Sequence, residues 1–136
     1  MTAAMTIAVV QEQGRVPVTV FEVAGNIDTS TYERLQTQAE AAYRDGMRYL
    51  LIDLTQVIYV SSAGLRALHR IAGLLRSADS TEGRPASPPG MFDGSFKSPY
   101  LKLLNPSSDI ARALKLTGFD MMLDVYNDLP AAIASF

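Results

Sequence analysis

The sequence predicts an α/β fold, a mixed β-sheet of about five strands packed with about four helices. The chain begins with two Val-rich apolar segments on either side of a Gly-containing turn, which is typical of a β-hairpin. Each later apolar run is followed by a segment of helical periodicity, which favours strand–helix units and parallel strand pairing. The expected order along the 136 residues is therefore ββαβαβαβα, with helices on one or both faces of the sheet.

The hairpin is the first predicted element. Residues 6–11 and 16–23 form its two strands, and the turn between them contains Gly14. The second strand is expected to end at residues 24–26.

A helix is predicted next, because apolar side chains recur at helical spacing up to about Asp45, where Gly46 supplies a stop. Residues 27–30 lead into this helix. The following segment, residues 49–54, is nearly all apolar and is expected to form a central strand. The apolar face of the helix comprises Tyr32, Leu35, Ala39, Ala42 and Tyr43.

A second helix with one apolar face is predicted over residues 62–75. The segment 77–99 is dense in Ser, Gly and Pro, and can form neither a long helix nor a central strand. We therefore expect a flexible insertion there, within a single domain that spans residues 1–136. The inward face of the helix comprises Leu65, Leu68, Ile71, Ala72 and Leu75.

The rest of the chain is expected to alternate between strand and helix. Gly118 is a predicted left-handed helix end, and Asn127-Asp128 is expected to cap the last helix. The predicted elements are a strand at 100–104, a helix at 109–116, a strand at 121–126 and a helix at 129–136.

Composition and charge exclude several classes of function. A net charge of −2 with scattered basic residues provides no nucleic-acid footprint, which needs a basic patch. The chain has no Cys and a single His, so disulfides, zinc–thiolate sites and sites that need two His are excluded. It shows neither a secretion signal nor an apolar stretch long enough to span a bilayer. We therefore expect a cytoplasmic protein that uses no cofactor and no metal.

Two hydroxyl side chains, Ser61 and Ser62, stand at the start of the second predicted helix. A hydroxyl there can cap the helix by accepting a hydrogen bond from a free backbone N–H group. It can also carry a phosphate, because the positive end of the helix dipole tolerates the added negative charge. Ser61 is the expected cap. Asp28, which precedes the first helix, is open to two compatible interpretations, a helix cap or a contact with a partner.

The ordered set of motifs resembles a STAS domain of the stand-alone kind called anti-anti-sigma factors, or anti-sigma factor antagonists. The resemblance covers nearly the whole chain except the segment 77–99, and it depends on the set rather than on any single motif. The matching segments are Gly25-Asn26-Ile27-Asp28, residues 51–54 with Val57, residues 59–65, residues 103–106, residues 114–119 and residues 125–128.

This resemblance implies roles for the residues of two loops. Aligned on Gly64, the serine that is phosphorylated in the family is Ser62. Ser61 stands where the family frequently has Asp, and Ala63 stands where it has Ser or Thr. Asp28 matches an acidic residue that lies near the switch serine and the partner surface in the family. The implied partner-binding residues are Asp28, Thr29, Ser30, Tyr59, Ser61, Ser62, Ala63, Leu65 and Arg66.

The function that the resemblance implies is bacterial partner switching in the regulation of transcription, including stress responses. The unmodified protein would bind an anti-sigma factor with a GHKL-type serine kinase fold and so release the sigma factor. Phosphorylation of Ser62 would end the complex, and a PP2C-type phosphatase would restore the unmodified form. The chain itself would be a binding protein and not an enzyme.

Two other functions are alternatives to partner switching. A STAS subunit of a lipid-transport complex or of a signalling assembly would share the fold and would not need phosphorylation of Ser62. A small enzyme or nucleotide binder could use the helix start at residues 61–64 as an anion site. The chain lacks the glycine-rich phosphate loop, the P-loop lysine and a base beside Ser62 that such a function needs.

Overall fold

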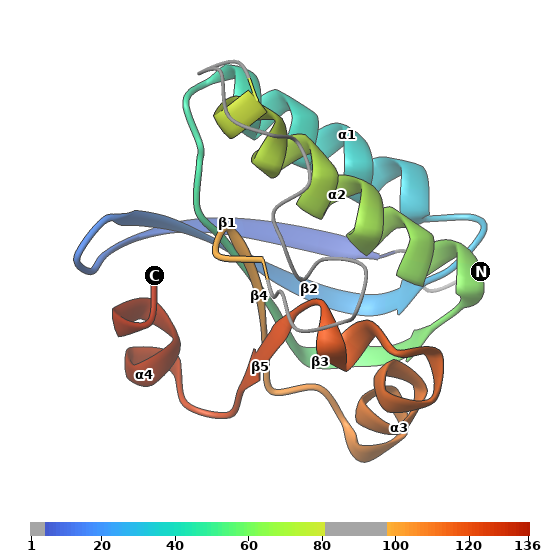
Figure 1. The fold of residues 1–136 in the computed structure, drawn as a ribbon. Coiled ribbons are helices and arrows are strands. Elements are labelled where there is room, and N and C mark those ends of the chain that lie inside the picture. The colour runs from blue at the N-terminus through green and yellow to red at the C-terminus, as the bar shows by residue number, and fades with distance from the viewer. Residues whose placement is uncertain (1–4, 81–97) are drawn as a thin grey trace.

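The computed structural model describes residues 5–80 and 98–136, and it confirms the predicted α/β arrangement (Figure 1). One mixed sheet has the strand order β1-β2-β3-β4-β5. The strands are β1 (Thr6–Gln13), β2 (Pro17–Ile27), β3 (Leu50–Val60), β4 (Leu101–Leu104) and β5 (Asp124–Tyr126). The helices are α1 (Tyr32–Arg44), α2 (Ser62–Ser80), α3 (Ser108–Thr117) and α4 (Leu129–Ala134), with a short 3-10 turn, η2 (Phe119–Met121).

The directions of the strands decide where the helices lie. β1 pairs antiparallel with β2, whereas the strands from β2 to β5 are parallel neighbours in chain order. Connections between parallel strands are right-handed. The connections β2–β3, β3–β4 and β4–β5 all step across the sheet in the same direction, so their helices are expected on the same face. α1 and α2 accordingly lie side by side over one face, and α4 covers the opposite face (Figure 1).

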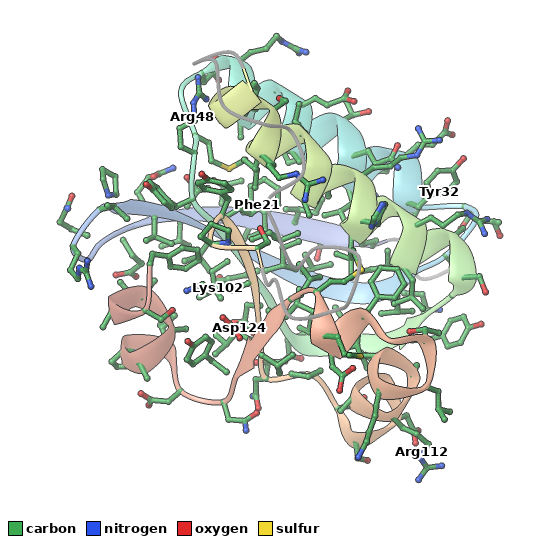
Figure 2. All side chains as sticks on the ribbon, viewed as in Figure 1. Phe21, Tyr32, Arg48, Lys102, Arg112 and Asp124 are labelled. Carbon is green, nitrogen blue, oxygen red and sulfur yellow. The ribbon has the colours of Figure 1, made fainter. Side chains whose placement is uncertain are left out.

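The larger core lies between the sheet and the helices α1, α2 and α3. Phe21 of β2 is fully buried there (Figure 2). Leu35 and Ala39 of α1 are buried, and so are all the predicted inward positions of α2. Full burial of a side chain such as Leu68 stabilises the fold by about 1.5–3 kcal/mol. The two helix faces that the sequence predicts therefore fix α1 and α2 against the sheet.

The opposite face is covered by α4, whose Ile133 and Phe136 belong to a second apolar cluster. Lys102 of β4 is buried beside this cluster (Figure 2). Its Nζ donates a hydrogen bond to the carbonyl oxygen of Ser135 at 2.8 Å and lies 4.7 Å from the ring centre of Phe136. The ammonium group thus satisfies a carbonyl at the end of α4, where the helix itself provides no partner.

β2 and β3 are both longer than the sequence predicts. The predicted end of β2 at residues 24–26 is wrong, because β2 continues to Ile27, and β3 continues well past its predicted end to Val60. Between the pairs Glu22↔Asp53 and Ile27↔Val60, β3 uses two residues more than β2. Such bulges interrupt the alternation of apolar and polar residues, so the strand pattern is lost in the sequence.

Two other boundaries differ from their predictions. α2 runs to Ser80, beyond the start of the loop predicted over 77–99, while residues 81–97 lie outside the described residues. The last strand begins only at Asp124. Gly118, at φ 81°, ends α3 in the predicted left-handed conformation. η2 includes Met121, the first residue of the strand predicted over 121–126.

None of the helices in residues 5–80 and 98–136 combines the length and the apolar character that crossing a bilayer requires. The single domain over residues 1–136 stays a prediction, because residues 1–4 and 81–97 lie outside the described residues.

Asp128 caps α4, since its Oδ2 accepts a hydrogen bond from the backbone N–H of Ala131 at 2.9 Å. We expect Asp128→Ala to lower the free energy of unfolding by about 1 kcal/mol, the usual cost of a lost N-cap. Asn127→Ala is the matched control, because Asn127 is an exposed neighbour that does not cap the helix. Urea denaturation measures both variants, and equal losses would contradict the assignment of the cap.

Candidate functional site

Two loops meet at the carboxyl ends of the neighbouring strands β2 and β3. Residues 28–31 lead from β2 into α1, and Ser61 leads from β3 into α2; both turns lie at the right-hand end of Figure 1. Ile27 and Val60 are paired across the two strands. The backbone N–H of Ser61 donates a hydrogen bond to the Ile27 carbonyl at 2.9 Å. The two groups of predicted site residues are therefore held at one end of the molecule.

The first turn of α2 packs directly on the end of β2. A Cβ atom at Gly64 would lie 2.5 Å from the carbonyl oxygen of Ile27 and 2.9 Å from Cγ1 of Val60. Non-bonded carbon atoms prefer separations of about 3.5–4.0 Å, so any side chain here would push the helix away from the strand. Gly64 is therefore needed for close packing, and this packing sets the position of the serines that precede it.

The two serines have separate roles. Ser61 is the N-cap of α2, as expected, because its Oγ accepts a hydrogen bond from the Gly64 N–H at 3.2 Å. Ser62 is the first residue of the helix and is exposed. Its hydroxyl makes no hydrogen bond to any residue in the described ranges. The hydroxyl of Ser61 thus caps the helix, and the cap does not use the hydroxyl of Ser62.

Asp28 organises the loop before α1. Its Oδ1 accepts hydrogen bonds from the hydroxyl of Ser30 at 2.7 Å, from the backbone N–H of Ser30 at 2.9 Å and from the Thr31 hydroxyl at 3.3 Å. These bonds, with that from the Ser30 hydroxyl as the largest cause, hold the pKa of Asp28 below its usual value. The interpretation of Asp28 as a cap of the helix is wrong, because α1 begins only at Tyr32 and the carboxylate caps the preceding turn.

The bulged end of β3 exposes two large apolar side chains beside these loops. Tyr59 is 54% exposed and Ile58 is 73% exposed. Ile58 is the extra residue of a bulge, because Val57 and Tyr59 pair with consecutive residues of β2. Ile58 is not among the site residues predicted from the sequence. Only the pairing of the strands reveals that it lies on the surface beside Tyr59.

A hollow of about 230 Å³ lies between the first turns of α1 and α2. Arg66 and Arg70 line it from α2, while Tyr32 and Glu33 line it from α1; Figure 2 shows Tyr32 at this end of the molecule. Within residues 5–80 and 98–136, neither arginine forms an ion pair or a hydrogen bond. Arg70 and Glu33 were missed by the sequence analysis, although the spacing of four residues between Arg66 and Arg70 places both on one side of a helix.

A larger hollow, of about 690 Å³, lies between the hairpin and the C-terminal end of α1. Val9, Met47 and Tyr49 are among its lining residues, and it contains none of the predicted site residues. Size alone therefore does not mark the candidate site.

Two of the predicted partner contacts are buried in the fold. Ala63 is 5% exposed and Leu65 is 6% exposed, so neither offers much surface to another protein. The remaining members of the predicted set are exposed or half-buried and lie at the same end of the molecule. These are Asp28, Thr29, Ser30, Tyr59, Ser61, Ser62 and Arg66.

We expect Gly64→Ala to lower the free energy of unfolding by about 1–3 kcal/mol, because the added methyl group overpacks the contact with Ile27. Gly73→Ala is the matched control in the same helix, since a Cβ there meets nothing within 4 Å. That change should raise the free energy of unfolding by about 0.5–1 kcal/mol through helix propensity. Chemical denaturation measures both variants, and effects of the same sign would refute the packing role of Gly64.

We expect Ser30→Ala to raise the pKa of Asp28 toward its usual value, because the hydroxyl of Ser30 makes the largest contribution to lowering it. A lowered pKa stabilises the fold above the usual pKa, and this stabilisation is lost as the pH falls through the folded-state value. The variant should therefore lose less stability in acid than the parent. Titration of the Asp28 carboxyl carbon by NMR measures the shift. Thr29→Ala serves as the control and should leave that pKa unchanged.

Comparisons with known proteins extend this description. The STAS domain family matches residues 8–81, which is more than half of the chain. An anti-sigma factor antagonist from Mycobacterium paratuberculosis has a solved structure that is 25% identical in sequence, with a TM-score of 0.68, over 99% of this chain and 97% of that one. No curated protein matches the chain.

Two solved structures of SpoIIAA are similar in fold alone, since each is 15% identical with a TM-score of 0.54 over 92% of this chain. One is the anti-sigma factor antagonist SpoIIAA in its unphosphorylated form, with 93% of that chain covered. The other is SpoIIAA, a Bacillus cell fate determinant, in its phosphorylated form, with 96% covered. The match to the family, together with the mixed sheet and the helix start at Ser61, establishes that this chain belongs to the STAS domain family.

Proposed function

We propose that this chain is an anti-sigma factor antagonist that acts by partner switching under the control of phosphorylation at Ser62. The observation that carries the proposal is the exposed, unbonded hydroxyl of Ser62 beside a serine that already caps the helix. The similarity to the antagonist from Mycobacterium paratuberculosis supports the general role. In this proposal the chain is a binding protein rather than an enzyme, and it needs no cofactor.

The proposed partner is an anti-sigma factor with a GHKL-type serine kinase fold. In the modification step, the Ser62 oxygen attacks the γ-phosphorus of ATP, its proton passes to a base of the kinase, and ADP leaves. A PP2C-type phosphatase then hydrolyses the phosphoserine to serine and inorganic phosphate. A kinase can reach this oxygen without unfolding the chain, because Ser62 is exposed and its hydroxyl has no partner in the described residues.

The proposed docking surface surrounds Ser62. Tyr59 and Ile58 supply apolar area, and aromatic side chains of this kind often anchor protein interfaces. Asp28 and Arg66 contribute charges of both signs, which favour one orientation of the partner. Ala63 and Leu65 are left out of this surface, because they are buried.

A phosphate on Ser62 would act on the docked complex more than on the fold. Phosphoserine carries about −1.5 to −2 charges at neutral pH. The start of α2 offsets part of this charge, by roughly 0.3–1 kcal/mol at an exposed helix end. A docked partner would have to desolvate the same charge, and a cost of about 4 kcal/mol would weaken binding about a thousandfold.

We expect the purified chain to acquire one phosphate, at Ser62, when it is incubated with ATP and the GHKL-type kinases of its own genome. The Ser62→Ala variant should acquire none. Ser61→Ala should still be modified, because Ser61 serves as the cap and not as the acceptor. Mass spectrometry after proteolysis locates the phosphate.

The binding arm of the same experiment uses the kinase that modifies the chain. Its affinity for Ser62→Ala should equal its affinity for the parent, and its affinity for Ser62→Asp should fall at least about tenfold. If Ser62→Asp binds as firmly as the parent, partner switching is excluded. A STAS subunit that does not use serine phosphorylation would then be the function to test.

A further inference from the structure

Ser62 and Arg66 lie one helical turn apart on α2, and both are exposed. Residues four apart on a helix are surface neighbours, with Cβ atoms about 5–6 Å from each other. Helical side chains also lean toward the N-terminus of their helix, so the Arg66 side chain leans toward the turn that holds Ser62. Arg66 and Ala63 line the same hollow, so the Arg66 side chain lies beside the first turn of α2.

The guanidinium group of Arg66 forms neither a hydrogen bond nor an ion pair with any of the described residues. This holds even though Glu33 of α1 lines the same hollow. The other charged group there is Arg70, which lies a further turn along α2. Two cationic side chains therefore line the hollow with one carboxylate. Neither arginine forms an ion pair within the described residues, and Arg66 is the one nearer to Ser62.

We propose that Arg66 is the intramolecular counter-ion of the phosphate on Ser62, an inference that rests on the proposed function. An anionic side chain four residues before a cationic one is the favourable order on a helix. A guanidinium group binds phosphate oxygens through two parallel N–H groups, and such charge-assisted bonds are stronger than neutral ones. Arg70 lies eight residues from Ser62, about 12 Å along the helix axis, and is too distant for the same role.

This pairing changes what phosphorylation does to the docking surface. The phosphate adds negative charge beside Tyr59, and it also binds a cation that the unmodified chain offers to its partner. One modification thus alters two features of the surface, while the fold gains a contact within the first turns of α2.

The test uses the full chain with phosphoserine placed at position 62 during translation, so that no kinase and no partner are required. ³¹P NMR follows the second ionisation of the phosphate. A neighbouring guanidinium favours the dianion, so Arg66→Gln should raise the titration midpoint by about 0.3 pH unit or more. Arg66→Lys should recover part of this shift, because lysine keeps the charge but lacks the fork of donors. Arg70→Gln is the matched control and should leave the midpoint near that of the parent.

Thermal unfolding gives a second measurement on the same proteins. Phosphoserine at position 62 should raise the melting temperature more in the parent than in Arg66→Gln, because only the parent gains the pair. Equal midpoints and equal gains in Arg66→Gln and Arg70→Gln would overturn the role of Arg66. That result would leave the proposed function standing, whereas a chain that no kinase modifies at Ser62 would overturn the proposed function and leave the pairing measurable.

Discussion

The approach of α2 to the Ile27 carbonyl is the constraint on which the candidate site depends. One oxygen accepts the N–H of Ser61 and leaves room only for a glycine at position 64. Asp28 follows Ile27 directly, so the same contact fixes the spacing between the two loops. A destabilising feature lies next to this contact, because Asn26 Oδ1 is buried without a hydrogen-bond partner in the described residues. A loss of about 1–3 kcal/mol is typical of such an atom, which indicates that the geometry here is not optimised for stability alone.

The different roles of Ser61 and Ser62 follow from the contact between Ile27 and the start of α2. A helix start has N–H groups that need acceptors, and a lone serine there would be needed by the fold. Ser61 supplies that acceptor to Gly64, so the hydroxyl one position later is not required for capping. Because the side chain of Ser62 does not cap the helix, a charge added to it would have little effect on folding. The pair Ser61-Ser62 therefore separates the hydroxyl that caps the helix from one that the cap does not use.

Most of the architecture could be predicted from the sequence, because it depends on periodicity within single segments. The inward face of α2 from Leu65 to Leu75, the left-handed end at Gly118 and the cap at Ser61 are all local patterns, and all are present. The long ends of β2 and β3 could not be predicted, because a bulge depends on the partner strand. Ile58 was missed for the same reason. The turn at Asp28 depends on which nearby donors the folded loop presents.

The rigidity of this end of the molecule favours a switch that works through charge. The end of β2 and the start of α2 are held together by the hydrogen bond from the Ser61 N–H to the Ile27 carbonyl and by the close packing of Gly64 on Ile27. The inner face of α2 is buried from Leu65 to Leu75. A large movement of α2 would expose that face, and exposing even two of its leucines would cost several kcal/mol, or about 1.5–3 kcal/mol each. The interaction between an exposed phosphate and the helix start is worth less than this. A phosphate on Ser62 would therefore leave the backbone in place and change the electrostatic character of the surface around it. If Arg66 pairs with the phosphate as proposed above, the change in surface charge would extend from Ser62 to Arg66, one turn along α2.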